Sequence, residues 1–521
     1  MESTQTLVTT VHGFPVLALL QLLPLGAALA LIRVRREGPA IALGLAAAAA
    51  ELALAAYLYV RLDHGSAALQ FAERWSLSPA LNYHAGVDGV AVIFILLTAL
   101  LSLLVVIYAP VRRLRPVPHF LAVALACEAT LMSLFTTLDL MWFVMLSAVE
   151  LGLVGYLMGR WATSPGEELA RQRYWEFMGT GLALLLAGTL LLGWNYAVAH
   201  AGHWSFDLTE LASVPVDPAL SSLTFFLLFY GLAIRTPLFP LHGWLPLVAE
   251  HGNVAVAPVF LLGLKVGIYG LVRFVFPLLP EAVDRWSPYV VAFAAAGIFY
   301  AALLALMQTN LRRLLAYAVV SHTSVLVIGL FSLGTAAFQG AVMLSANFGL
   351  AIAGLLFMTG CVYLRTRTTD LDKLGGLFDR LPMIGVAFFV AGLSIVGMPG
   401  TPGFDAVHLM LEAAIARFGA LVTIAAALGN VAAAAFLLWA FQRAFLGPAR
   451  WEATAKPGMA PAPPACPPSL AAKIPPATWP ERVIAGVVIL VLLGAGFYSE
   501  PWLEVTDAPL TALAARFGLG H

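Results

Sequence analysis

The residue with the clearest potential for chemistry is Lys265, which lies near the middle of an uncharged apolar run, residues 254–271. A charge at the centre of a bilayer costs roughly 2.5–3.5 kcal/mol on insertion scales, so such a residue persists where it faces protein or water. Desolvation disfavours the ammonium form, so a buried lysine can exchange protons near neutral pH. We interpret Lys265 as a proton relay; the alternative is a fixed charge paired with a carboxylate.

Further ionisable residues in apolar segments could extend such a relay: Arg235, Glu150, His322, His408, Asp405 and Glu128. Histidine titrates near neutral pH, so His322 suits a proton switch. Asp405 and His408 are three residues apart and share a face if they are helical. With Glu412 they could form an exit group, or they could simply be polar residues at an interface. Asp139 is read mainly as a helix cap.

Two segments carry helix-breaking residues. Residues 234–246 contain Pro237, Pro240 and Pro246, and residues 397–403 contain Pro399, Gly400 and Gly403. An interior proline removes an amide donor and clashes with the preceding turn, so neither segment can be one regular helix. The breaks are about 165 residues apart. Paired interrupted helices indicate an internal repeat with a transport site between the halves, rather than kinks that only ease packing.

The composition is that of a membrane protein: 61% of the residues are hydrophobic, 11% are charged, and the mean hydropathy is +0.90. Apolar stretches of about 20 residues recur along the chain. We predict an all-α membrane protein with about fourteen transmembrane helices, near residues 14–33, 40–61, 90–109, 118–136, 138–159, 174–198, 221–246, 254–278, 288–308, 313–334, 338–364, 382–415, 418–446 and 482–499.

The basic residues predict the orientation of these helices. Twenty of the 28 Lys and Arg residues fall in loops on one side, which we assign to the cytoplasm. Both termini are then extracytoplasmic. The predicted units are N-terminal helices 1–3 (1–115), a first repeat of helices 4–8 (116–280), a second of helices 9–13 (281–447), a Pro- and Ala-rich cytoplasmic linker (448–480), and helix 14 with a short amphipathic segment (481–521).

Cofactor chemistry is not expected within the chain. The three cysteines, Cys127, Cys361 and Cys466, show no metal or redox spacing, and no nucleotide loop, zinc motif or nucleophile elbow occurs. We therefore predict no metal, no cofactor, no nucleic acid partner and no catalytic site of its own.

The chain resembles the antiporter-like subunits of respiratory complex I and its relatives, and most closely subunit M, from about residue 84 to 448. The resemblance is carried by Gly86-Val87-Asp88-Gly89, Phe135 with Asp139, Pro237, Pro240, His242, Trp244, Leu245 and Pro246, Lys265 with Tyr269-Gly270-Leu271 and Arg273-Phe274, Ala316-Tyr317, Ser321-His322, Gly375-Gly376-Leu377, Pro399-Gly400, and Leu438-Trp439 through Gly447-Pro448. It implies a fourteen-helix fold with inverted five-helix repeats, helices 7 and 12 being broken.

The same resemblance implies a chain of buried ionisable residues that carries protons. It also implies other membrane subunits and a soluble catalytic partner as partners, and the bacterial inner membrane as the location.

Several residues depart from the family pattern. The expected glutamate of helix 5 falls at Ala148, and Glu150 stands two residues later, a rotation of roughly 200° on a helix. We therefore expect Glu150 to take its place only if that helix is locally rearranged. The family lysine of helix 7 is Arg235, which keeps the charge but does not readily release a proton.

Two further family positions hold uncharged residues here. The ionisable residue expected after the second break is Val407, and the histidine expected in helix 11 falls at Asn347 or Phe348. Even so, we predict that Glu150 or Glu128 contacts Arg235, so that the ion pair tunes Lys265.

Three functions remain open. The first is a proton-translocating subunit of a complex-I-like assembly, non-catalytic itself but possibly part of an NADH-quinone oxidoreductase-type translocase. The second is the proton-coupled membrane subunit of a dissolved inorganic carbon uptake complex with a large zinc-containing, carbonic-anhydrase-like partner. The third is a subunit of a multi-subunit cation/proton antiporter. The co-purifying chains would distinguish them.

Overall fold

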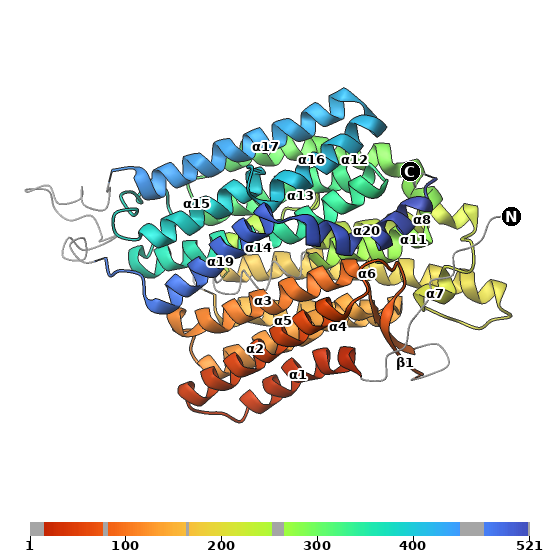
Figure 1. The fold of residues 1–521 in the computed structure, drawn as a ribbon, viewed down its shortest axis with the longest axis horizontal. Helices are drawn as coiled ribbons and strands as arrows, with labels where there is room; N and C mark the ends of the chain where they lie inside the picture. The colour runs from red at the N-terminus through yellow and green to blue at the C-terminus, as the bar shows by residue number, and fades with distance from the viewer. Residues whose placement is uncertain (1–14, 77–81, 163–165, 253–264, 449–473, 519–521) are drawn as a thin grey trace, which may run out of the picture.

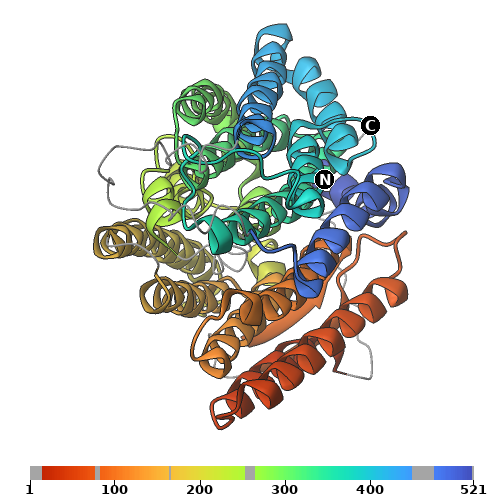
Figure 2. The ribbon, with the colours of Figure 1, turned by 90° about the vertical axis from the view of Figure 1, so that its left-hand side faces the viewer.

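The computed structural model describes residues 15–76, 82–162, 166–252, 265–448 and 474–518. Within these ranges, eleven helices are long and apolar enough to cross a membrane, and two shorter apolar helices accompany them. The helices run side by side in one bundle, with α1 and α2 at one edge and α17 at the opposite edge (Figures 1 and 2). The multi-pass membrane architecture is thus confirmed, while the count of fourteen stays a prediction, because residues 253–264 lie outside the described part.

The N-terminal half contains the following helices: α1 (Val16–Leu31), α2 (Glu37–Arg61), α3 (Gly89–Arg112), α4 (Val117–Thr136), α5 (Leu140–Arg160), α6 (Glu167–Ala199), α7 (Leu208–Leu211), α8 (Pro218–Arg235) and α9 (Leu245–His251). Residues 265–270 are helical and continue into a π-helical turn, η1 (Leu271–Val275), and α11 (Phe276–Leu278).

The C-terminal half contains α12 (Pro280–Leu306), α13 (Leu311–Phe331), α14 (Thr335–Thr366), α15 (Pro382–Val396), α16 (Pro402–Phe418), α17 (Ala420–Phe441), a second π-helical turn η2 (Gln442–Leu446), α19 (Trp479–Phe497) and α20 (Glu500–Ala515). α20 lies within residues 481–521, for which the sequence analysis expects a short amphipathic segment after the last transmembrane helix.

The all-α prediction misses one element, an antiparallel hairpin of β1 (Gln70–Ser76) and β2 (Asn82–Val87). The hairpin holds the start of α1 in place, because the buried Glu73 carboxylate accepts hydrogen bonds from the amides of Leu17 at 2.9 Å and Ala18 at 3.1 Å. Glu73 thereby meets two of the amide donors that the first turn of a helix leaves unsatisfied. The hairpin was missed because its strands lie between apolar helices and carry no long alternating pattern.

The hairpin end of the bundle is fixed by buried polar contacts outside the spans. His84 Nδ1 lies 2.5 Å from Asp207 Oδ2, and both side chains are buried. Burial raises the pKa of Asp207, but hydrogen bonds from His84 and Thr209 outweigh this effect and hold its pKa below the usual range. Asp139 accepts a hydrogen bond from the Trp142 amide at 2.8 Å, so it caps α5 as the sequence indicates.

The same backbone device occurs twice in the chain. Each time, the residues before a helix form a single antiparallel bridge with a loop about 60–70 residues later. The bonds of the first bridge are Leu140 N to Phe206 O (2.9 Å) and Leu208 N to Leu138 O (2.8 Å), and those of the second are Leu311 N to Thr369 O (2.8 Å) and Leu371 N to Thr309 O (2.7 Å).

The two bridges lie at opposite ends of the bundle. The first adjoins the start of α3, since Ala85 of β2 also bridges to Thr137. The second adjoins the end of α14, and there Arg112, the last residue of α3, donates a hydrogen bond to Gly360 O. The start and the end of α3 are on opposite sides of the membrane, so the device is inverted from one half of the chain to the other.

Both predicted helix breaks are confirmed. α8 ends at Arg235 and α9 begins at Leu245, with turns between them. α15 ends at Val396 and α16 begins at Pro402, and here the left-handed φ values of Gly397 (76°) and Gly400 (85°) suit residues without a Cβ atom.

The protein itself satisfies backbone carbonyls near both breaks. The Trp244 indole donates a hydrogen bond to Ile234 O at 3.1 Å. At the second break, the Asn347 amide donates to Ser394 O at 3.1 Å, and the Ser394 hydroxyl donates to Asn347 Oδ1 at 2.6 Å. Non-helical backbone at membrane depth is tolerated only where protein or water meets its polar groups. Trp244, from within the first break, and Asn347, from the neighbouring α14, therefore stabilise the backbone next to the two breaks.

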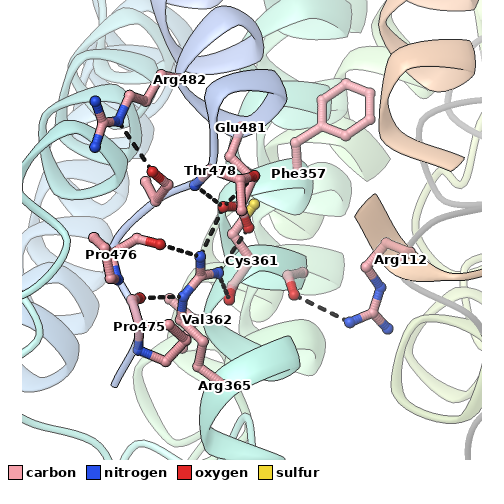
Figure 3. A network of polar contacts seen from close by, with 12 residues as sticks. Arg112, Phe357, Cys361, Val362, Arg365, Pro475, Pro476, Thr478, Glu481 and Arg482 are labelled. Carbon is pink, nitrogen blue, oxygen red and sulfur yellow. Dashed lines mark hydrogen bonds and ion pairs between the residues drawn. The ribbon is translucent and has the colours of Figure 1, made fainter. Parts of the chain in front are cut away.

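A buried ion pair fastens α19 to α14. The Arg365 guanidinium donates to both carboxylate oxygens of Glu481, each at 2.7 Å, and also to the carbonyls of Pro475 and Pro476 (Figure 3). Bidentate pairs of this kind add geometric specificity to the charge attraction. The last described residues before α19 are thus held against the end of α14.

Gly267 lies where the Lys265 helix presses against the first break. A Cβ atom at Gly267 would overlap the Thr236 hydroxyl and stand 2.9 Å from Leu232 O. We predict that Gly267→Ala destabilises the folded chain by roughly 1–3 kcal/mol, the usual cost of overpacking. Denaturant unfolding in detergent measures this loss. Gly243→Ala is the matched control, because a Cβ there meets only Phe177 at 3.6 Å; equal stability of the two variants would contradict the prediction.

The charge-based orientation gives a second prediction. Cys127 and Cys361 are buried, so Cys466 in the linker serves as a natural reporter. A membrane-impermeant maleimide should label the chain in inside-out vesicles and not in right-side-out vesicles, and Cys466→Ser should abolish the label. Labelling from the outside alone would reverse the assigned topology.

Candidate functional site

The predicted contact with Arg235 is confirmed, and its partner is Glu150. Arg235 Nη2 lies 2.6 Å from Glu150 Oε2, and both side chains are buried. Arg235 is the last residue of α8, directly before the break, and Glu150 lies in the middle of α5. Charge-assisted hydrogen bonds of this length are among the strong ones in proteins.

The expectation that the fifth helix must be rearranged is wrong. α5 is a continuous α-helix, and Glu150 belongs to its inward face with Phe143, Ser147 and Val154, which follow at helical spacing. Ala148, the position where the family glutamate was expected, lies on the exposed face. The family charge is therefore kept on the side of α5 that faces α8, two residues further along the chain.

Lys265 is buried, with 5% of its surface exposed, and no carboxylate pairs with it among the described residues. Its side-chain stem packs beside Gly349, and Nζ lies 4.5 Å from the centre of the Phe348 ring. A cation over an aromatic face is stabilised by the ring quadrupole without an anion. The described structure therefore offers no support for the fixed ion pair that was the alternative to a relay.

His322 shares Phe348 with Lys265. The His322 ring stacks on Phe348 with 4.8 Å between the ring centres, and within the described chain its Nε2 atom has no hydrogen-bond partner. His322 and Lys265 also interact electrostatically. Phe348 stands at one of the two positions where the family histidine was expected. Its ring contacts both Lys265 and His322.

Small cavities accompany these charges. One is lined by Lys265, Thr236, Thr323 and Phe348 and has room for about one water molecule. Another of similar size lies beside Arg235, against Ser147 and residues of α6. Thr236, which directly follows Arg235 in the chain, lines the Lys265 cavity, so this cavity adjoins the residue that ends α8. We refer to Glu150, Arg235, Lys265 and His322 together as one series.

The residues after the second break do not join this series. Val407 faces inward, whereas Asp405 is half-buried and His408 and Glu412 are exposed on the outer face of α16. Two of these side chains sit on the face that a neighbouring chain or lipid would cover. The described structure therefore does not bring Asp405 and His408 to Lys265 and His322.

Glu128 also lies apart from Arg235. It is buried in α4, and the electrostatic interactions of its carboxyl group are with Glu51 of α2, beside Ser102 of α3. Sequence reasoning did not single out Glu51.

A second buried ion pair was not predicted. Arg273 of η1 donates to both carboxylate oxygens of Asp88, at 2.8 and 2.6 Å, and to the Tyr269 hydroxyl at 3.1 Å. Tyr269 in turn donates to Phe135 O at 2.8 Å. All of these residues belong to motifs that carry the family resemblance, yet only the fold shows that they are partners. The pair joins the start of α3 to the helix of Lys265.

The comparisons with known proteins agree with this geometry. The family model described as NADH:quinone oxidoreductase/Mrp antiporter, transmembrane, matches residues 130–433, more than half of the chain. Subunit M of the F(420)H(2) dehydrogenase of Methanosarcina mazei is 31% identical over 444 residues, which are 83% of this chain and 88% of that protein.

Two solved structures share the fold. A chain of respiratory complex I from Thermus thermophilus with bound NADH superposes with a TM-score of 0.81 at 25% identity, covering 96% of this chain and all of that one. A chain of the Mrp complex from Dietzia sp. gives a TM-score of 0.82 at 20% identity, covering 98% of this chain and all of that one. The chain therefore belongs to the NADH:quinone oxidoreductase/Mrp antiporter family of membrane proteins and is an antiporter-type membrane subunit similar to subunit M of complex I.

Proposed function

We propose that this chain conducts protons across the inner membrane as one subunit of a complex-I-like assembly. The observation that carries the proposal is the buried Lys265, which has no carboxylate partner among the described residues. Lys265 interacts electrostatically with His322 and shares a small cavity with Thr236, the residue after Arg235. An unpaired lysine in an apolar site is the kind of group that gains and loses a proton easily.

Arg235 supplies a fixed positive charge beside Glu150. A guanidinium does not release its proton in proteins, so Arg235 keeps Glu150 ionised. The pair then acts on Lys265 by its electric field, and Lys265 and His322 carry the proton. A change in the assembly that separates Glu150 from Arg235 would leave Arg235 uncompensated and favour the neutral form of Lys265.

The architecture suits this role. We propose that residues 116–280 and 281–447, the predicted helices 4–8 and 9–13, are inverted repeats. The two broken helices, the two inverted backbone bridges, and the π-helical turns η1 and η2 near the end of each block support this proposal. The transport site of such folds lies at the repeat interface near the bilayer midplane. Three candidate residues lie apart from the Glu150, Arg235, Lys265 and His322 series: Glu128, Asp405 and His408. Proton transfer between them and the series would need additional groups.

The partners are proposed from the relatives, which are subunits of multi-subunit membrane complexes. We propose neighbouring membrane subunits on the exposed apolar faces and a soluble redox partner that drives the transport. The relatives described above do not support the inorganic carbon alternative. The likeness to the Mrp chain, at 20% identity, shows a shared fold alone.

Lys265 provides the decisive test of the relay. Lys265→Met removes the charge and the exchangeable proton but keeps a long apolar stem, and Lys265→Arg keeps the charge without a releasable proton. We expect proton transport in vesicles with the reconstituted assembly to fall at least tenfold in both variants. Lys373→Met, at an exposed loop lysine, should leave transport unchanged. Survival of Lys265→Arg would make Lys265 an electrostatic anchor, and survival of both would make the chain a scaffold.

The ion pair is tested separately. Arg235→Met leaves the Glu150 carboxylate buried without a partner, and breaking one side of a buried pair costs roughly 3–5 kcal/mol. We therefore expect poor folding from Arg235→Met but near-normal assembly and transport within a few-fold for Arg235→Lys, which restores the cation.

The partner variant Glu150→Gln removes the field while it keeps the size of the side chain. It should lower transport strongly with little loss of assembly, as measured by co-purification. Full transport by Glu150→Gln would show that the pair has only a structural role.

A further inference from the structure

Two buried carboxyl groups lie outside the series described above. Glu51 of α2 is fully buried, and Glu128 of α4 is 1% exposed. Within the described part of the chain, none of their four carboxyl oxygens has a hydrogen-bond partner. An ionised carboxylate without hydrogen bonds in such a setting is very costly, so the site must hold something that removes the charge.

The packing of α2, α3 and α4 places these groups opposite each other. A Cβ atom at Gly44 of α2 would stand 3.3 Å from Leu121 of α4 and 3.3 Å from Val106 of α3. Because α2 and α4 are both antiparallel to α3, they run in the same direction. Two turns on from Gly44 and from Leu121, about 10.5 Å along each axis, come Glu51 and Glu128 on the same faces.

The third helix contributes a hydroxyl at this depth. α3 runs in the opposite direction, so Ser102, one turn before Val106, is displaced from Val106 toward the two glutamates by about 6 Å along the axis, and it is the polar neighbour of Glu128. Glu51 and Glu128 interact electrostatically. The two carboxyl groups and the Ser102 hydroxyl thus come from three packed helices, α2, α4 and α3.

No described cation lies at this level. α1 carries no titratable residue, and α2 carries others only at its ends, Glu37 and Arg61, with Tyr57 and Tyr59 in its last turns. The other titratable groups on the packed elements are Tyr108 and Arg112 near the end of α3, His119 and Cys127 of α4, the paired Glu150 of α5 with Tyr156 and Arg160 near its end, and Tyr83 and His84 of β2, of which His84 pairs with Asp207. Two like charges in one apolar site cannot both persist.

We infer that Glu51 and Glu128 form a proton-binding carboxyl pair in the N-terminal helices, a protonation site separate from Lys265 and from the Glu150–Arg235 pair. Cys127, next to Glu128 in α4, interacts electrostatically with Glu150. α4 therefore stands between the carboxyl pair on one side and the ion pair on the other. A proton taken up by the pair changes the charge one helix away from the proposed path.

Infrared spectroscopy of the full-length chain in lipid vesicles tests the protonation. The difference spectrum between the unaltered chain and the E51Q/E128Q double variant should show the C=O band of a protonated carboxyl group, with a shift in D₂O and an amplitude that changes with pH. A difference spectrum with carboxylate bands alone would overturn the proposal. So would bands that respond to Na⁺ and not to pH, which would mean a cation site.

Dicyclohexylcarbodiimide tests the pairing. It adds to a protonated carboxyl group: the acid proton passes to a carbodiimide nitrogen, the carboxyl oxygen bonds to the central carbon, and the acyl group then moves to nitrogen, with no leaving group. We expect one adduct per chain, on Glu51 or Glu128, and none on the ion-paired Glu150. Adducts on both glutamates of one chain would mean two separate sites.

The inference stands apart from the proposed relay. Lys265→Met should keep both the infrared band and the single adduct while transport is lost. Loss of the band in Lys265→Met, with a normally folded chain, would show that the carboxyl groups belong to the lysine path and not to a separate site.

Discussion

The constraint on which this structure depends is the absence of water inside a bilayer, so that each polar group there must find its partner within the protein. The two broken helices meet this constraint with side chains that lie close to the breaks: Trp244 for Ile234 O and Asn347 of α14 for Ser394 O. The breaks in turn set the position of Arg235, at the end of a helix and facing Glu150.

The same constraint explains why the charged groups fall into two kinds. Glu150–Arg235, Asp88–Arg273 and Arg365–Glu481 are compensated at hydrogen-bond distance, and the last two are bidentate. Such pairs are expensive to break, because the remaining partner would be left buried and charged. Lys265, His322, Glu51 and Glu128 have no such pairing among the described residues. We regard the first kind as the frame and the second kind as the groups that can change protonation.

The departures from the family pattern have a common physical reading. Glu150 keeps a carboxylate on the inward face of α5, and Arg235 keeps a cation at the break, so the electric field is kept although the residue position or type differs. Phe348, at one of the two positions where the family histidine was expected, is an aromatic ring without a titratable group, and it contacts both Lys265 and His322. Val407 leaves the inward face of α16 apolar. Among the described residues, the proposed path thus contains fewer titratable groups than the family pattern.

The sequence by itself determined the membrane class, the two broken helices, the cap at Asp139 and the position of Lys265 in a buried apolar setting. These follow from local chemistry: hydropathy over a span, the missing amide of proline, and the cost of a charge in an apolar run. It could not decide that α5 stays regular, that Asp88 meets Arg273, or that Glu51 and Glu128 come close enough to interact. Those facts depend on how the helices rotate and align against each other. This packing is decided jointly by residues that lie far apart in the chain.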